Sequence, residues 1–189
     1  PGCHHAIYSF KSVTDYFTSN GSTVNICALD MSKAFDKVNQ FTLFVKLMSR
    51  NLPRTLISLL FVWYSNSVAV VSWKGHTSHS FSLQSGVRQG GCLSPILFLV
   101  YVDSLIERLA SSGLGCYVEG LCMSILMYAD DLVLVSASIF DLQRMIDICV
   151  DELSNLDMRI NVKKSTCRED SLKLIFVLSN FFKYLEIKI

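Results

Sequence analysis

The sequence has little charge, only three prolines and no apolar run long enough to cross a bilayer. Its longer apolar runs, such as Ile96–Val102, fall well short of the ~18 residues that a membrane-spanning helix needs, so we expect no membrane partner. Charged residues make up 17% of the chain and hydrophobic residues 51%, a balance that excludes intrinsic disorder and predicts a large core. Repeats and low-complexity linkers are also lacking, and 189 residues suit one domain or slightly more.

The seven cysteines form no CxxC pair, and they lie scattered in apolar stretches. We therefore expect buried, reduced thiols in an intracellular protein. Cys3–His5 could belong to a metal site, but helix-start residues are the simpler interpretation, because no second ligand pair follows at finger-like spacing. The net charge of +1 gives no support for a nucleic-acid partner, unless positive and negative residues are segregated within the fold.

Hydrophobic periodicity predicts helices that alternate with short strands. A helical stripe ends at Asn20-Gly21, and an alternating strand follows that ends near Asp30. Further helices are predicted over 40–51, 53–66, 94–113 and 138–157; a hairpin is predicted over 67–83 with Gly75 at its turn, and a glycine-rich loop over 84–95. Because local hairpins are mixed with helices, the pattern favours an α+β fold with an antiparallel sheet.

Two adjacent aspartates, Asp130 and Asp131, interrupt two apolar runs in MYADDLVLV. Each charge is costly to remove from water, and adjacent like charges repel, so a bound cation is the simplest compensation. The two runs read as a tight hairpin, and Asp30 ends another strand. If these strands are neighbours, three carboxylates meet and form a site for hard divalent cations. A surface turn with solvated aspartates is the alternative interpretation.

Four segments resemble, in order, the palm motifs of reverse transcriptases of the non-LTR (LINE-type) retrotransposon class. They are ALDMSKAFDKV, SGVRQGGCLSPILF, YADD and NVKKS, and the resemblance extends from Gly2 to Thr166. It implies a polymerase palm, an antiparallel sheet backed by helices, with partial fingers. It also implies an RNA-directed DNA polymerase that uses an RNA template, a DNA primer and dNTPs, in the nucleus or cytoplasm.

The resemblance assigns the catalytic centre to the aspartates. Asp30 and Asp130 would bridge two Mg²⁺ ions, or Mn²⁺ in their place; Asp131 would support the metals or the primer end, and the Met31 carbonyl would add a ligand. Lys164 matches the lysine that protonates departing pyrophosphate, with Lys163 as its alternative; a solvated basic pair is the competing interpretation.

The resemblance also implies nucleotide contacts. Phe35 matches the aromatic sugar gate that selects deoxynucleotides, although an ordinary core phenylalanine is the alternative; for Asp36 we expect a structural role, such as capping the following helix. Gln89 and Gly90 would lie near the incoming nucleotide, and Arg88 would contact phosphate or template. The neighbouring Gly86 and Gly91 would likewise permit close backbone approach, as would Gly90.

We expect a fragment, because the chain starts at Pro1 without an initiator Met and the usual fingers segment, thumb and endonuclease are missing. The predicted division is palm over 1–36, a fingers-like insertion over 37–84, palm over 85–170 and a divergent tail over 171–189, where Glu186 replaces the glycine usual in a primer grip. Two other hypotheses remain: a catalytically silent relic that keeps the palm fold, and an RNA-templated RNA polymerase, which would usually carry GDD and a polar residue instead of Phe35.

Overall fold

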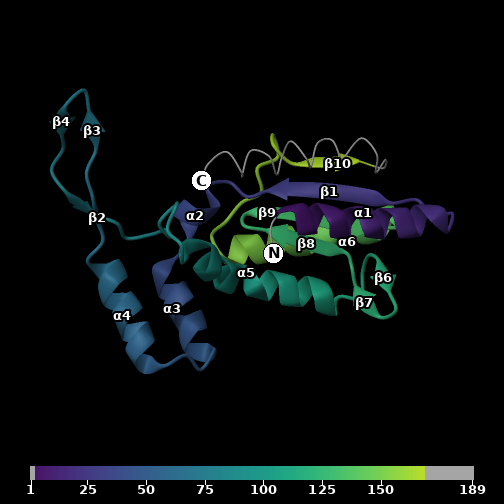
Figure 1. Cartoon of the computed structure of the whole chain (residues 1–189), viewed down its shortest axis with the longest axis horizontal. Helices are drawn as coiled ribbons and strands as arrows, with labels where there is room; N and C mark the ends of the chain where they lie inside the picture. Colours follow the sequence, from purple (N-terminus) through teal and green to yellow (C-terminus); the bar gives the residue numbers. More distant parts are fainter. Residues whose placement is uncertain (1–2, 169–189) are drawn as a thin grey trace. The chain divides into compact units, whose positions relative to one another are not determined.

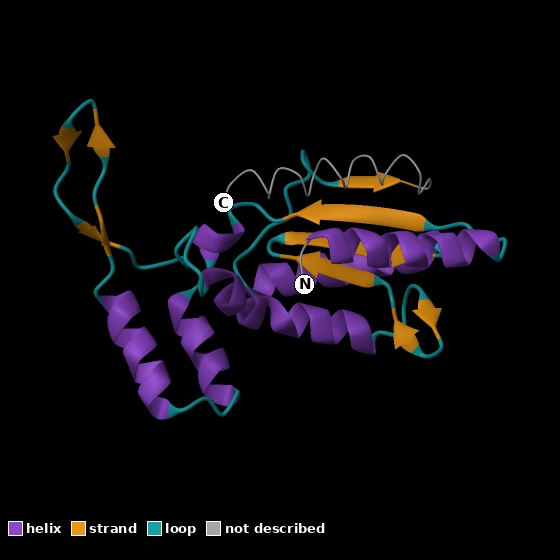
Figure 2. Cartoon of the chain, viewed as in Figure 1, coloured by secondary structure: helices purple, strands orange, loops and turns teal. Residues whose placement is uncertain are grey.

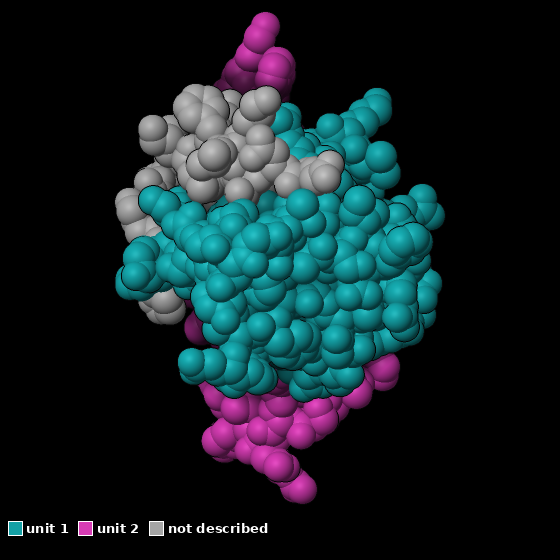
Figure 3. All heavy atoms as spheres, turned by 90° about the vertical axis from the view of Figure 1, so that its right-hand side faces the viewer, with its two compact units in different colours: residues 1–32, 103–189 teal, residues 33–102 magenta. Residues whose placement is uncertain are grey.

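The computed structural model describes residues 3–168, and the chain divides into two compact units, which Figure 3 colours separately. The first unit comprises residues 1–32 and 103–189, and the second comprises residues 33–102. The division falls within one long helix, α5 (Ser94–Ser111). The tail predicted over 171–189, including Glu186, lies outside the described residues.

The first unit is built around a four-stranded antiparallel sheet with the strand order β10-β1-β9-β8 (Figure 1). A separate two-stranded hairpin, β6–β7, precedes β8. The elements of this unit are α1 (Cys3–Ser19), β1 (Asn25–Asp30), β6 (Tyr117–Val118), β7 (Leu121–Cys122), β8 (Ile125–Tyr128), β9 (Asp131–Ser136), α6 (Ile139–Asn155) and β10 (Thr166–Arg168).

Helix α1 covers one face of this sheet. Its residues Phe10 and Val13 are buried in a cluster with Ile26 of β1 and with Val133 and Val135 of β9. These strand positions are two residues apart, so their side chains share a face of the sheet. The apolar stripe of α1 therefore packs on the alternating apolar residues of β1 and β9, and these are the two patterns from which the helix and the strands were predicted.

The opposite face of the sheet is also buried. Leu132 and Leu134 of β9 are fully enclosed, although they point away from the α1 cluster. Helix α6 contacts both β9 and β1 and buries the row Leu142, Met145, Cys149 and Leu153. The helix begins where the sequence predicted, because the Ser138 side chain accepts a hydrogen bond from the Asp141 backbone N–H. The predicted antiparallel sheet backed by helices is confirmed.

The expectation of reduced cysteines is wrong for one pair. Cys27 on β1 and Cys167 on β10 are direct partners in the antiparallel register, and their sulfur atoms form a disulfide. The described cysteines that remain free include Cys116 and Cys149, which are buried as expected. Within residues 3–168, no helix is long and apolar enough to cross a membrane.

The second unit combines helices with an extended hairpin (Figure 2). The Lys74-Gly75 turn of the hairpin has positive φ at both residues, as a type I′ turn requires, so the turn predicted at Gly75 is confirmed. The elements are α2 (Ala34–Lys37), α3 (Gln40–Ser49), α4 (Arg54–Ser65), β2 (Val68–Ala69), β3 (Ser72–Trp73), β4 (His76–Thr77), β5 (Phe81–Ser82) and the first part of α5.

The second unit is longer at both ends than the insertion predicted over 37–84. The extra segments are hydrogen-bonded to each other: the Gly86 N–H donates to the Val38 carbonyl, and the Val87 N–H donates to the Phe35 carbonyl, both at 2.8 Å. The glycine-rich loop and α2 therefore belong to one compact body together with the α3–α4 pair.

Candidate active site

Asp30 and Asp131 face each other across adjacent strands at the end of the sheet. They are the last register pair between β1 and β9, so their side chains project from the same face. The Asp131 residue is only 7% exposed, and the Asp30 side chain is 14% exposed. The strand end and the hairpin predicted from the sequence thus bring two of the three predicted carboxylates together.

Asp130 lies in the two-residue turn that joins β8 to β9. The first residue of this turn, Ala129, has a φ of 53°, a left-handed conformation that is unusual for a residue with a Cβ. Positive φ at the first central residue alone fits a type II′ turn, where glycine is normally preferred. The chain therefore tolerates backbone strain next to the paired aspartates, a feature that clusters at functional sites.

The three carboxylates influence one another electrostatically. Burial, followed by the charges of Asp130 and Asp30, raises the pKa of Asp131 from its ordinary value of 3.8 to about 7, while the Lys164 ammonium acts in the opposite direction. Such a raised pKa means that the ionised form of Asp131 is poorly compensated by the protein alone. A cation at this position would relieve the repulsion.

The chemistry of these donors fits a hard divalent ion, since carboxylate oxygens are the preferred ligands of Mg²⁺ and Mn²⁺. The Met31 carbonyl is a further candidate ligand. Met31 forms an antiparallel bridge with Ile160, and the two hydrogen bonds of this bridge are accepted by the carbonyls of Arg159 and Asp30, so the bridge does not use the Met31 carbonyl. Within the described part of the chain, however, no group of three or more His, Cys, Asp or Glu residues is already arranged as a metal site.

Lys164 lies beside Asp30, with its Nζ atom 3.8 Å from Asp30 Oδ1 and its side chain 68% exposed. The turn that carries it is attached to the end of β1. The Asp30 N–H donates to Ser165 Oγ at 3.1 Å, and the Asn161 N–H donates to the Asp30 carbonyl at 2.8 Å. This turn therefore fixes the backbone of Asp30 while it presents Lys164. Lys163, the predicted alternative, is exposed.

Phe35 belongs to α2 of the second unit. It is half-buried, and its ring packs against the fully buried Phe98 with 4.9 Å between the centroids. Asp36 does not cap the following helix, so that expectation is wrong: the N-cap of α3 is Asn39, whose side chain accepts the Thr42 N–H. Asp36 instead lies exposed in the first turn of α2, where a negative charge is favourable.

The glycine-rich loop of the second unit holds Arg88, Gln89 and Gly90 exposed. Gly90 has positive φ, and a Cβ built on it would meet nothing within 4 Å, so its open surface is compatible with an approaching ligand. Gly86 also has positive φ, but glycine is required there because of close packing: a Cβ would lie 3.0–3.1 Å from the backbone of Phe35 and Asp36. The close approach at Gly86 is therefore to α2.

Sequence reasoning missed several residues at these places. Ser165 and Asn161 hydrogen-bond the Asp30 backbone. In the sequence, the only sign that they lie near the site was their position in the motif NVKKS. Trp63 and Tyr64 line a pocket with the glycine-rich loop, although in the sequence they looked like part of an ordinary helical stripe. No local signal marks them, because Arg88, the basic residue of this pocket, lies in a distant segment of the sequence.

The fold and the carboxylates define a polymerase palm. The chain superimposes on a telomerase from Candida albicans, solved in complex with a TWJ fragment of telomeric RNA, with a TM-score of 0.68 and 16% identity; the match covers 87% of this chain and 31% of that chain. Residues 2–185 match the family described as reverse transcriptase (RNA-dependent DNA polymerase). The chain belongs to this reverse transcriptase family.

Its relatives come from transposable elements. The chain is 32% identical over 139 residues to the Retrovirus-related Pol polyprotein from type-2 retrotransposable element R2DM of Drosophila melanogaster, a match that covers 74% of this chain and 13% of the polyprotein. It is 25% identical over 174 residues to the Transposon TX1 uncharacterized 149 kDa protein of Xenopus laevis, covering 90% of this chain and 13% of that protein. The chain thus spans only a small part of these relatives.

Proposed function

We propose that the chain is the palm, with part of the fingers, of a LINE-type retrotransposon polymerase. It transfers a nucleotide from a dNTP to the 3′-hydroxyl of a DNA primer on an RNA template. The observation that carries this proposal is the pairing of Asp30 with Asp131 at the end of the sheet, next to Asp130 in its turn. Residues 1–36 and 85–170 form the palm in this proposal, and 37–84 form the fingers-like insertion. The RNA fragment bound by the Candida albicans telomerase supports an RNA partner.

Asp30, Asp130 and Asp131, together with the Met31 carbonyl, would hold two Mg²⁺ ions, or Mn²⁺ in their place, and bound ions would stabilise the attacking and leaving oxygens. Lys164 donates a proton to the departing pyrophosphate. Its place 3.8 Å from Asp30 supports this role, and its high exposure leaves the ammonium accessible to a substrate. Lys163 is the alternative donor.

The second unit contributes the nucleotide contacts. Phe35 limits the space beside the sugar and so disfavours a 2′-hydroxyl; its ring is supported by Phe98. Gln89 hydrogen-bonds the incoming nucleotide, and the open surface at Gly90 permits its close approach. Arg88, which is exposed, contacts phosphate or template.

A catalytically silent relic is the second candidate. It is favoured by one observation: no set of three metal-ligating side chains is already assembled within residues 3–168. In a relic, the palm fold and the binding of nucleic acid would persist without nucleotide transfer. The two candidates therefore differ in turnover, while their folds are the same.

Primer extension on poly(rA)/oligo(dT) tests the proposal. We expect little or no processive synthesis by the chain alone, because it spans only 13% of the R2DM polyprotein, and positioning and phosphate neutralisation draw on more of such a protein. A chimera in which this chain replaces the matching segment of the Drosophila R2DM polyprotein should extend the primer. In the chimera, Asp30→Asn should lower the rate at least about 100-fold, while Asp15→Asn, an exposed carboxylate of α1, should not. A folded chimera that binds primer–template but never extends it would favour the relic.

A further inference from the structure

The charges of the chain are segregated between its two units. Counted from the sequence, residues 33–102 contain seven Lys or Arg and one acid, Asp36, a net charge of +6; the remaining residues contain ten Lys or Arg and fifteen acids, a net charge of −5. These opposite charges cancel to the +1 of the whole chain. A local basic excess is the electrostatic footprint of a surface that binds a polyanion, and nucleic acid is the common one.

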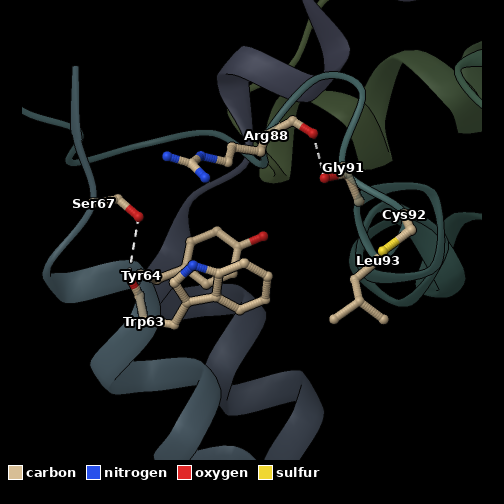
Figure 4. Close-up of a pocket in the computed structure, with 8 residues that line it drawn as sticks. Trp63, Tyr64, Ser67, Arg88, Gly91, Cys92 and Leu93 are labelled. Atoms are coloured by element: carbon tan, nitrogen blue, oxygen red, sulfur yellow. Dashed lines mark hydrogen bonds between the residues drawn. The ribbon is translucent and has the colours of Figure 1, made fainter. Parts of the chain in front are cut away.

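Within the second unit lies a pocket of about 200 Å³, between the end of α4 and the loop that leads into α5 (Figure 4). Trp63 and Tyr64 form its aromatic side, and Arg88 and Leu93 come from the loop. The Trp63 and Tyr64 rings are tilted by 58° with their centroids 6.2 Å apart, so they do not stack on each other. Trp63 is 49% exposed, which leaves its ring available to a ligand.

The walls of this pocket are held by hydrogen bonds. Ser67 Oγ donates to the Trp63 carbonyl at 3.0 Å, and the Gly91 N–H donates to the Arg88 carbonyl at 3.0 Å. The buried Ser94 also donates to the Arg88 carbonyl. Burial raises the pKa of the Tyr64 phenol, while the nearby Arg88 charge and a hydrogen bond with the Ser94 side chain act in the opposite direction. The aromatic side and the guanidinium are thus parts of one preformed pocket.

The chemistry of the pocket suits a flat ring that carries a negative charge nearby. Its volume is below the range of about 300–1,000 Å³ of pockets for drug-sized ligands, so it fits a smaller group. The aromatic side chains offer stacking surfaces, Arg88 offers a cation for a phosphate or a ring face, and none of the eight lining residues is an acid. A nucleobase with its adjoining phosphate combines these features.

We propose that this pocket receives an unpaired base of the single-stranded RNA template, stacked on the exposed ring of Trp63 with Tyr64 beside it, while Arg88 binds the adjoining phosphate. This inference rests on the proposed polymerase function and adds to it a holding point for the template strand. Stacking accepts every base, so the pocket works on any template sequence. The exposed apolar side chains of α4, such as Phe61 and Val62, suit a protein partner, but the net charge of +6 favours a polyanion.

The chain contains two tryptophans, which provide a matched pair of probes. Trp63 lines the pocket, whereas Trp73 lies on β3 of the hairpin and is 72% exposed. A Trp73→Phe variant leaves Trp63 as the one indole in the chain, with the pocket intact. Titration with an (rA)12 oligonucleotide in EDTA should quench its fluorescence, because a stacked base contacts the ring directly. A Trp63→Phe variant, in which Trp73 reports, should show a much smaller change.

Fluorescence anisotropy with labelled (rA)12 gives the energetic test. We expect Trp63→Ala to weaken binding about 5- to 150-fold, the range for one stacked base, and Trp73→Ala to have little effect. An abasic strand with the same phosphates should bind the wild-type chain weakly, and its affinity for Trp63→Ala should be the same as for the wild type. Arg88→Ala should make the slope of log K against log[salt] shallower by about 1, the change expected for the loss of one phosphate contact. A (dA)12 strand should bind no more tightly than (rA)12, and tighter binding of the DNA strand would contradict a pocket for the RNA template.

Several results would overturn the inference: equal effects of Trp63→Ala and Trp73→Ala, an unquenched Trp63, or self-association that depends on Trp63 while the oligonucleotide has no effect. The assay is distinct from that of the proposed function, because EDTA removes divalent ions and no nucleotide is transferred. Loss of primer extension would leave a positive binding result standing, and a negative binding result would leave the role of Asp30 standing.

Discussion

Replacement of Asp131 by asparagine should stabilise the metal-free chain at neutral and alkaline pH. The pKa of Asp131 in the folded chain is raised to about 7, against an ordinary value of 3.8. The folded state therefore holds this proton more tightly than the unfolded state does. As the pH rises from about 4 to 7, the unfolded chain loses the proton first, so the free energy of unfolding falls; above pH 7 the penalty is complete. Asparagine has the same shape and cannot ionise.

The size of this effect follows from the pKa shift. A shift of about three units corresponds to about 4 kcal/mol. Because the Lys164 side chain beside the aspartates is 68% exposed, solvent reaches this end of the sheet, and screening reduces the expected gain to about 2 kcal/mol. For a chain of this length, that gain should raise the melting temperature by about 4–8 °C at pH 8.

Thermal unfolding in EDTA between pH 4.5 and 8 measures the gain. The difference between Asp131→Asn and the wild type should grow with pH up to about 7 and then level off. Asp15→Asn, an exposed carboxylate of α1 in the same unit, should melt with the wild type at every pH. If Asp131→Asn were less stable than the wild type at pH 8, the burial and the carboxylate repulsion that raise the pKa of Asp131 would not act as described.

Two further predictions concern the second unit. Gly86→Ala should destabilise the chain by at least about 1 kcal/mol more than Gly90→Ala in chemical denaturation, because both have positive φ but only a Cβ at 86 meets backbone, 3.0–3.1 Å away; equal losses would contradict the close packing on α2. In the chimera, Phe35→Val should raise the kcat/KM for rNTPs relative to that for dNTPs. The change in this ratio should correspond to a loss of up to a few kcal/mol of discrimination against the 2′-hydroxyl. An unchanged ratio in Phe35→Val would end the gate assignment.

Much of the first unit could be predicted from the sequence, because its signals are local. Alternation marked β1 and β9, the Ala129-Asp130 break marked the hairpin, and apolar stripes marked the two helices. Once a strand end and a hairpin are neighbours in one antiparallel sheet, the pairing of Asp30 with Asp131 follows from the register.

The features that were missed depend on contacts between distant segments. The Cys27–Cys167 disulfide requires β10, a strand of three residues that is too short for alternation to be recognised. The role of Gly86 depends on the backbone of α2, and the aromatic pocket depends on how α4 packs beside the glycine-rich loop. The charge segregation was present in the sequence, but it could be counted only once the limits of the second unit were known.

The central claim, that Asp30, Asp130 and Asp131 form a divalent metal site, is tested most directly by Mn²⁺ binding to the metal-free chain. Electron paramagnetic resonance measures free Mn²⁺ during a titration. We expect the wild type to bind Mn²⁺, Asp30→Asn and Asp131→Asn to bind it at least about 10-fold more weakly, and Asp15→Asn to match the wild type. Equal binding by all four proteins, or no binding by the wild type, would contradict the assignment.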